Sequence, residues 1–255
     1  MVARPPFLLI TCEHGGNRVP IRYRRQFSGC KPLLASHRGY DPGALNMAHE
    51  LAHHFRAPLV YATVSRLVVD LNRSIGHRAL YSDRTRGLAR AEHARLLARH
   101  YHPYRDRVEA FVAKAIAAGR RVVHISSHSF TPMLDGRVRN ADIGLLYDPA
   151  RPGERALSAA WCAVLGRAIA PLRVRRNYPY QGRNDGLTRR LRRQYPASRY
   201  VGIELEINQK YVTAQQRFPA TLRRAVVESL QRTLDGRLDA ESRRTRRSRQ
   251  SRMAP

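Results

Sequence analysis

Polar side chains able to perform hydrolytic chemistry follow or interrupt apolar runs at four places in the chain. They are His14, the pair Asn72 and Arg73, His128, and Glu206. Imidazole is the commonest metal ligand, and a catalytic zinc ion takes about three protein ligands and keeps one position for water. A free carboxylate can accept the proton of that water, and an arginine beside an asparagine can bind an anionic group. These residue types indicate a metal-dependent hydrolytic site for an anionic substrate.

The first of these residues belongs to the segment CEHGGN (residues 12–17), which directly follows the apolar run Leu8–Thr11. The run predicts a short buried strand, and the two glycines allow a sharp turn and the close approach of a ligand. Open α/β sheets carry their chemistry at the carboxyl ends of their strands, which favours a functional site here. The alternative is a polar turn with a surface histidine.

Three further carboxylates have positions that need an explanation. Asp41 precedes a proline at the entrance to a predicted helix over 44–55, where it could cap the helix or serve the site. Glu204 and Glu206 lie two residues apart in the strand-like segment 198–207, so their side chains share one face. Carboxylates in a buried strand need a partner such as a metal or an arginine.

Segments with strand and helix patterns alternate along the chain. Strands are expected at 8–11, 58–64, 121–125, 141–147, 172–176 and 198–207, and helices at 44–55, at 85–118 in two parts separated near Pro103, at 154–170 and at 218–234. This alternation predicts an α/β sandwich.

The composition limits the class of protein. The chain has 255 residues, of which 43% are hydrophobic, enough for one sizeable core. No apolar run approaches the ~20 residues of a membrane span, and the first residues lack the pattern of a signal peptide. The three cysteines are scattered and odd in number, so they indicate neither a disulfide framework nor a CxxC zinc site. We expect a cytoplasmic protein that does not contact a membrane.

The net charge is strongly basic, at +28, and comes almost entirely from arginine. Much of the excess lies in 242–252, SRRTRRSRQSR, where like charges without apolar partners predict disorder. We therefore expect a single domain over 1–235 and a basic disordered tail over 236–255. A cationic tail could bind nucleic acid non-specifically by releasing counterions, and the alternative is a solvated basic surface.

Six segments, in order along the chain, resemble motifs of the N-formylglutamate amidohydrolase family. They are CEHGGNRVP, YDPGA, SRLVVDLNRS, HISSHSF, NYPYQG and GIELEIN, and the resemblance covers roughly residues 8–230. That family is similar in fold to the zinc carboxypeptidases, which implies a three-layer sandwich with a mixed, mostly parallel sheet flanked by helices. The resemblance also implies a hydrolase, dependent on Zn²⁺ or another divalent metal, that removes the acyl group from a small N-acyl amino acid such as N-formylglutamate.

The resemblance implies that His14 and His128 are metal ligands. Carboxypeptidase-like sites usually have a glutamate three residues after the first histidine, but this position is Asn17, a poor zinc ligand. We predict Asp41 as the third ligand, with Glu13 as its competitor. Glu13 and His14 are adjacent, so an extended strand would point them to opposite faces.

The remaining matched positions imply roles in catalysis and substrate binding. Glu206 matches the general base of the final strand, whereas Glu204 is unassigned and could support the site or pair with a buried arginine. Residues 70–73, DLNR, resemble the carboxylate-binding segment of the carboxypeptidases. The expected substrate contacts are Arg66, Asn72, Arg73, Asn177 and Tyr180.

Two other functions stay open at this point. One is a nucleic-acid-binding protein on a degenerate hydrolase scaffold, which the basic charge would suit. The other is a hydrolase that acts on an amide of peptidoglycan or of a peptide.

Overall fold

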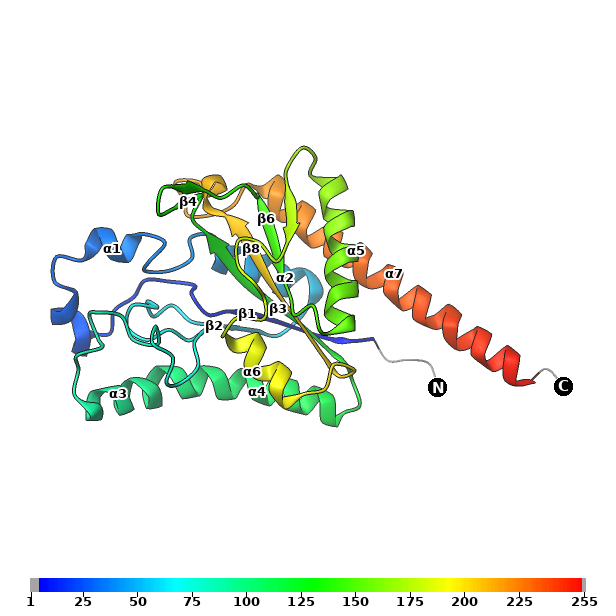
Figure 1. The fold of residues 1–255 in the computed structure, drawn as a ribbon, viewed down its shortest axis with the longest axis horizontal. Helices are drawn as coiled ribbons and strands as arrows, with labels where there is room; N and C mark the ends of the chain where they lie inside the picture. The colour runs from blue at the N-terminus through cyan, green and yellow to red at the C-terminus, as the bar shows by residue number, and fades with distance from the viewer. Residues whose placement is uncertain (1–4, 254–255) are drawn as a thin grey trace.

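A mixed sheet forms the centre of the protein in the computed structural model, which describes residues 5–253 and their side chains as far as residue 236. Six strands make up this sheet within the described residues, namely β1 (Phe7–Cys12), β2 (Leu59–Tyr61), β3 (Val122–Phe130), β6 (Ile143–Leu146), β7 (Val174–Arg176) and β8 (Tyr200–Asn208). They lie in the order β2-β1-β3-β8-β6-β7 (Figure 1). The β6–β8 pair is antiparallel and the other pairs are parallel. The prediction of a mixed, mostly parallel sheet is confirmed.

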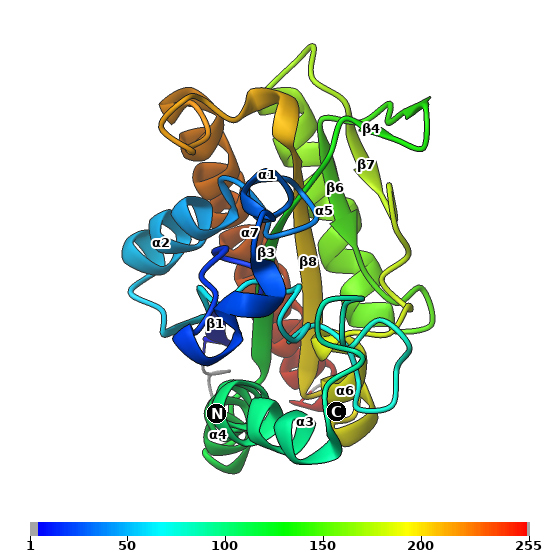
Figure 2. The ribbon, with the colours of Figure 1, turned by 90° about the vertical axis from the view of Figure 1, so that its left-hand side faces the viewer.

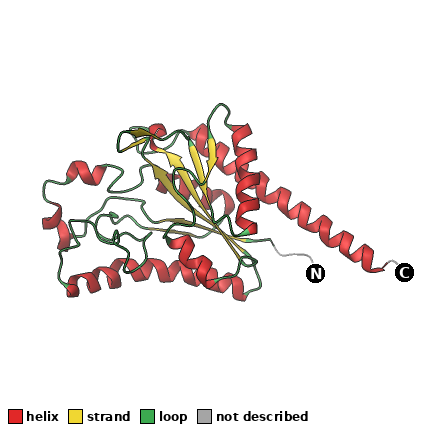
Figure 3. Ribbon diagram, in the orientation of Figure 1, coloured by secondary structure: helices red, strands yellow, loops and turns green. Residues whose placement is uncertain are grey.

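Helices cover both faces of this sheet (Figures 1 and 2). One face carries α2 (Ala44–Phe55), α5 (Pro152–Ala168) and α7 (Ala220–Met253), and the other carries α4 (His102–Ala117) and α6 (Leu187–Gln194). The smaller elements are η1 (Ile21–Phe27), α1 (Lys31–Ala35), α3 (Arg90–Leu96), η2 (Leu97–Tyr101), η3 (Gln209–Tyr211) and the hairpin of β4 (Met133–Leu134) and β5 (Arg137–Val138). The layers of helix and strand are distinct in Figure 3, and they form the predicted three-layer α/β sandwich.

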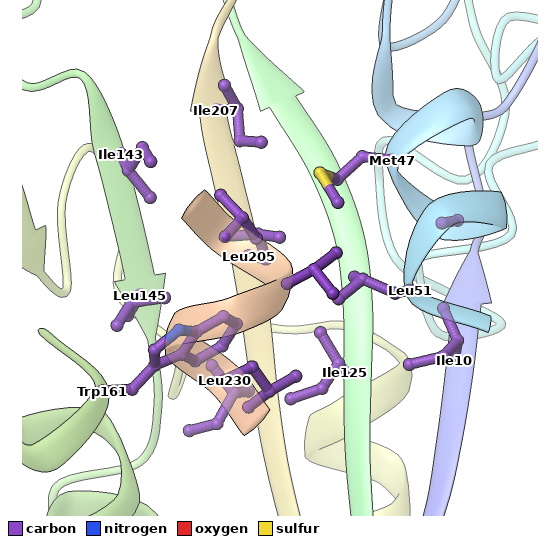
Figure 4. Close-up of a cluster of buried hydrophobic side chains, with 14 of the residues drawn as sticks. Ile10, Met47, Leu51, Ile125, Ile143, Leu145, Trp161, Leu205, Ile207 and Leu230 are labelled. Carbon is purple, nitrogen blue, oxygen red and sulfur yellow. The ribbon is translucent and has the colours of Figure 1, made fainter. Parts of the chain in front are cut away.

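Alternation of side chains along β8 divides its residues between the two faces. The odd-numbered residues from Val201 to Ile207 are fully buried in the main core, which also contains Trp161 (Figure 4). The even-numbered residues face the layer of α4 and α6, and among them are Glu204 and Glu206. One face of β8 therefore stabilises the fold while the other supplies carboxylates.

Several predicted elements differ from the observed ones. The helix predicted over 44–55 forms with those bounds, but the one predicted from residue 85 begins at Arg90. Its two parts are joined by the π-helical turn η2, and Pro103 lies in the first turn of α4, where its missing N–H is tolerated. We did not predict α6, whose sequence LTRRLRRQ resembles an exposed charged segment.

The C-terminal part of the chain was expected to be a disordered tail, whereas the backbone of α7 is helical to Met253. Leu230 is fully buried and Leu234 still packs against the main core. Residues 254–255 and the side chains after Gly236 lie outside the described residues. The division into a domain over 1–235 and a tail over 236–255 therefore stays a prediction. In the described part of the chain, every helix is too short or too polar to cross a membrane.

Candidate active site

A cavity of about 140 Å³ lies where β1, β3 and β8 end, the edge at which open α/β sheets bind ligands. It is lined by His14, Arg66, Asn72, Arg73, His128, Tyr180, Gln181, Asn184, Asp185, Glu204 and Glu206. A larger and more open hollow of about 740 Å³ lies beside Gly76–Tyr81, but no carboxylate lines it. The smaller cavity gathers most of the predicted residues and is the candidate active site.

His14, Asp41 and His128 form a group of possible metal ligands. All three side chains are buried, and one ligand atom from each lies within 4.8 Å of the others. Asp41 Oδ2 lies 3.4 Å from His14 Nδ1 and 2.8 Å from His128 Nδ1. The backbone N–H of Asp41 also donates to the carbonyl of His14, which ties the loop before α2 to the end of β1.

The second nitrogen of each imidazole contacts a different buried carboxylate. His14 Nε2 lies 2.7 Å from Asp70 Oδ1, and His128 Nε2 lies 2.9 Å from Glu13 Oε2. A carboxylate that accepts the Nε2 proton fixes the ring tautomer and leaves the Nδ1 lone pair free, as is usual for histidines that bind metals. Both Nδ1 atoms then point toward Asp41, so the donor set fits a divalent cation of the zinc class.

The electrostatics of this group favour positive charge. Burial lowers the pKa of His128, but hydrogen bonds with Asp41 and Glu13 outweigh it and hold this pKa well above its ordinary value. For the carboxyl group of Asp41, burial acts in the opposite direction and raises the pKa. The adjacent His14 and His128 nevertheless hold this pKa well below its usual range. A position that stabilises a proton between two carboxylates is also suited to a metal ion.

The guanidinium of Arg66 is held by two carboxylates. Its Nη1 lies 3.3 Å from Asp41 Oδ1, and its Nη2 lies 3.1 Å from Asp70 Oδ2. The guanidinium thus joins the two carboxylates that contact His14. Arg66 also lines the cavity, and its contact with a substrate stays a prediction.

Glu13 and His14 both reach the site, which corrects the expectation that they point to opposite faces. That expectation assumed an extended strand, but β1 ends at Cys12 and the chain turns at once. Besides His128, Glu13 accepts hydrogen bonds from the hydroxyl groups of Tyr104 at 2.6 Å and Ser126 at 2.5 Å. Glu13 therefore holds His128 from behind, while Asp41 lies between the two imidazoles.

Glu206 projects toward the cavity from β8, at the register position of His128 on β3. Its Oε2 is buried and has no hydrogen-bond partner among the described residues. Burial raises the pKa of Glu206 to about 8, and Asp41 and Glu204 add to the increase against the opposing effect of His128. A carboxyl group with a free oxygen and a pKa near neutrality is suited to proton transfer.

Asn72 and Arg73 line the cavity on the side of α6. Asn72 Oδ1 accepts the N–H of Leu187 at 2.7 Å, which leaves the amide nitrogen for other contacts. Arg73 Nη1 donates to the carbonyls of Asn72 and Asp185 at 3.1 and 2.8 Å. Arg73 forms no ion pair with a described residue, and its buried Nε has no partner among them. Its charge is available to a carboxylate in the cavity.

Tyr180 lines the mouth of the cavity, whereas the predicted contact Asn177 does not line it. Tyr180 is 42% exposed, and its hydroxyl group accepts a hydrogen bond from Arg139 at 2.9 Å. Asn177 Oδ1 accepts the N–H groups of Tyr147 and Gly182, so it holds the loop that carries Tyr180. A direct contact between Asn177 and a substrate stays a prediction.

Sequence reasoning did not assign several supporting residues. Asp70 had a usable signal, since it ends an apolar run two residues before Asn72. Tyr104 and Ser126 had no such sequence signal, because the Glu13 that they contact lies 91 and 113 residues away in the chain. Asp185, Gln181 and Asn184 line the cavity from loops without a distinctive pattern.

Known proteins resemble this chain in sequence and in fold. The model of the family described as N-formylglutamate amidohydrolase matches residues 7–213. The structure of the gene product Atu2144 from Agrobacterium tumefaciens is 32% identical, with a TM-score of 0.77 and 91% of each chain covered. That of an N-formylglutamate amidohydrolase from Ralstonia eutropha JMP134 is 20% identical, with a TM-score of 0.68, covering 91% of this chain and 94% of the other. No curated protein matches the chain.

Proposed function

The chain belongs to the N-formylglutamate amidohydrolase family, and we propose that it is a metal-dependent hydrolase that removes a formyl-like acyl group from the nitrogen of an amino acid. One observation carries this proposal. Two buried histidines and Asp41 present their donor atoms to one point, with an unpartnered Glu206 oxygen in the same cavity. Enzymes that use a metal ion for hydrolysis usually bind it with histidine and carboxylate ligands and keep a free carboxylate beside it.

In this proposal His14, Asp41 and His128 hold the metal, and Asp70 and Glu13 orient the two imidazoles. The chemistry that a divalent ion supplies at such a site is polarisation of the amide carbonyl and acidification of water. Asp41 also needs Arg66, whose guanidinium fixes the direction of its second oxygen. Zinc is our first choice of metal because the donor set consists of nitrogen and oxygen atoms in a buried site.

Glu206 is proposed to move the proton in the reaction. Water adds its oxygen to the acyl carbon, the carbon–nitrogen bond breaks, and the products are a carboxylic acid and a free amine. Glu206 takes a proton from the attacking water and returns it to the departing nitrogen. Its position supports this role, because its side chain enters the cavity beside His128 and its Oε2 has no hydrogen-bond partner among the described residues.

The substrate carboxylate is proposed to bind Arg73 and Asn72. Both side chains are fixed by backbone contacts, so they hold their remaining N–H groups in place before the substrate arrives. Arginine suits this role because its planar fork matches the two oxygens of a carboxylate. Tyr180, at the mouth, is positioned to cover the bound amide.

The proposal is tested by measuring metal content and amide hydrolysis on one preparation. We expect the purified protein to bind about one equivalent of a divalent metal and to hydrolyse N-formyl or N-acetyl amino acids. Chelation should abolish turnover and addition of zinc should restore it. A protein that binds no divalent metal and hydrolyses no member of the panel would contradict the proposal.

A further inference from the structure

Asp185 is a residue of the cavity wall whose carboxylate the proposed reaction does not use. It lies in the loop before α6, and both of its carboxylate oxygens contact Ser74. Oδ1 accepts a hydrogen bond from the Ser74 hydroxyl group at 2.6 Å, and Oδ2 accepts the Ser74 backbone N–H at 2.9 Å. Burial raises the pKa of Asp185, but these hydrogen bonds outweigh it and hold the pKa below its ordinary value. The group is therefore a carboxylate at neutral pH.

The charge of Asp185 would oppose an anionic substrate if both oxygens were unpaired. Asp185 and Arg73 line the same cavity, and Arg73 is the residue proposed to bind the substrate carboxylate. Like charges in a partly buried space repel, so a carboxylate here weakens binding unless donors neutralise it. Ser74 supplies two such donors. These contacts indicate that Asp185 holds the site together rather than binding the substrate.

Arg73 lies in a long connection that has no regular element to hold it. Residues 62–89, between β2 and α3, contain no helix or strand. Connections of this length depend on side-chain contacts for a fixed conformation. The loop before α6 supplies such contacts to three successive residues, Asn72, Arg73 and Ser74. Asp185 makes the contacts with Arg73 and Ser74, so it joins this connection to the base of α6.

The contact with Asp185 also decides which edge of the Arg73 guanidinium is left for a ligand. Nη1 donates to the carbonyls of Asn72 and Asp185 at 3.1 and 2.8 Å, which uses both of its N–H groups. Among the described residues, neither Nε nor Nη2 has a hydrogen-bond partner. These two nitrogens form one edge of the guanidinium, and such an edge matches the two oxygens of a carboxylate.

We propose that Asp185 is the positioning residue of the carboxylate site. Its side chain fixes the backbone at Ser74, and its carbonyl fixes the guanidinium of Arg73. This inference rests on the proposed function for the role of Arg73 in binding the substrate carboxylate. Asp185 acts through Arg73: it holds the donors in place before the ligand arrives, which removes an ordering cost from binding.

A double-mutant cycle with N-formyl-L-glutamate tests the inference. We expect D185A to raise KM about tenfold or more, because two hydrogen bonds that hold the site are lost, and to leave kcat within about threefold. In the R73K background, which lacks the fork, D185A should raise KM further by about threefold at most. The matched control is D83A, which removes a carboxylate from an exposed ion pair in the same connection and should leave KM unchanged.

S74A is the milder variant if D185A does not fold. It removes one of the two hydrogen bonds, so KM should rise about two- to tenfold, and R73K should again remove most of this effect. An unchanged KM, a loss confined to kcat or to the melting temperature, or an equal increase of KM in the wild-type and R73K backgrounds would overturn the inference and leave the proposed function intact.

Failure of the wild type to hydrolyse N-formyl-L-glutamate would instead contradict the proposed function. Calorimetric binding of L-glutamate to the same proteins then carries the test. D185A should weaken this binding about tenfold or more, and R73K should remove most of the difference. Equal affinity in the wild type and D185A, or no binding to the wild type, would overturn the inference.

Discussion

His14 and His128 each contact one buried carboxylate with Nε2 and face Asp41 with Nδ1. Two equivalent arrangements, one in the turn after β1 and one on β3, make an accidental cluster an unsatisfactory explanation. Buried carboxylates are costly unless each is paired, and every oxygen of Asp41 and Asp70 has a partner here. The contacts around the imidazoles therefore orient both Nδ1 atoms toward Asp41.

The first prediction ranks the metal ligands. We expect His14→Ala and His128→Ala to abolish metal retention, and Asp41→Ala to weaken it more than Glu13→Ala does. Glu13 acts through His128, and loss of such an orienting partner costs about 10–100-fold in affinity. Competition with a chelator measures these constants, and His54→Ala on the exposed side of α2 is the control. If Glu13→Ala weakens binding more than Asp41→Ala, the third ligand is Glu13.

The second prediction separates chemistry from substrate binding. Glu206→Gln keeps the shape but removes the base, so kcat should fall by ~10²–10⁴ while the metal stays bound. Arg73→Lys should raise KM by about one to two orders of magnitude, because a charged hydrogen bond contributes ~1.5–3 kcal/mol and an ammonium lacks the fork. Steady-state kinetics and metal analysis of both variants check this. A stable, metal-loaded and fully active Glu206→Gln protein would remove Glu206 from the mechanism.

The elements act on the site mainly by placing its loops. β6 is the clearest case, because the loop that carries Tyr180 packs directly on its backbone. A Cβ at Gly144 would overlap the carbonyl oxygen of Tyr178, and a Cβ at Gly182 would overlap the backbone of Tyr147. The two glycines let strand and loop approach more closely than any side chain permits. The mouth of the cavity is therefore positioned by β6, the strand beside β8.

The third prediction tests this positioning. Gly144→Ala should push the loop away from β6, so kcat/KM should fall about tenfold or more and the melting temperature should drop. The control is Gly166→Ala in α5, where a Cβ meets nothing within 4 Å. That change should stabilise the protein by about 0.5–1 kcal/mol and leave kcat/KM unchanged. Equal effects of the two substitutions on activity would contradict the role of β6.

The centre of the sheet also holds a histidine that serves the fold alone. His124 on β3 is fully buried, with Nε2 2.8 Å from the Thr11 hydroxyl oxygen and Nδ1 2.7 Å from that of Tyr200. Its partners lie on β1 and β8, so it joins three strands. The pKa of His124 is lowered to about 4, mainly by burial, with the positive charges of Arg192 and His128 contributing against the opposing effect of Glu13.

The fourth prediction follows from this pKa. The unfolded chain protonates this histidine near pH 6.5, whereas the folded protein does so near pH 4, so stability is lost as the pH falls between these values. The loss amounts to about 3.4 kcal/mol at most. Urea unfolding at pH 7 and pH 4.5, with a chelator present, should show this loss reduced in His124→Gln. Identical pH dependence in both proteins would contradict the assignment.

On the scale of the whole molecule, the charge of +28 is the property that the proposed reaction explains least. Many arginines of the described residues hold the structure together, as in the buried pair of Arg192 and Glu154. The excess of positive charge is densest in the sequence of residues 242–252, near the end of α7. Packing of α7 on the core extends at least to Leu234, and a boundary near residue 235 stays a prediction.

The fifth prediction concerns this boundary. Deletion of residues 236–255 should leave kcat/KM and the melting temperature unchanged, because the cavity and the described core lie in the remaining part. The same deletion should weaken retention on a polyanion column, because fewer cations release fewer counterions. A truncated protein that unfolds or loses activity would show that the last residues belong to the domain.

The sequence by itself determined the architecture and the edge of the sheet at which most of the candidate site residues lie. Alternating strands and helices predicted the sandwich, and helical spacing gave α2 its correct bounds. Because parallel strands end at one edge, residues that follow different strands, such as His14 and His128, were expected to gather there. α6 escaped prediction because its helix depends on burial of Leu187 and Leu191, which lie among four arginines.

Only the tertiary structure decided how the side chains divide their work. The local sequence pattern shows that Glu13 and Arg66 are charged. It does not show that Glu13 contacts His128. Nor does it show that Arg66 bridges Asp41 and Asp70. Those partners lie on segments far apart in the chain, and a hydrogen bond or ion pair depends on distances of a few tenths of an ångström. Sequence spacing defines strands and faces, whereas the pairing of side chains across them is set by the packing of the whole fold.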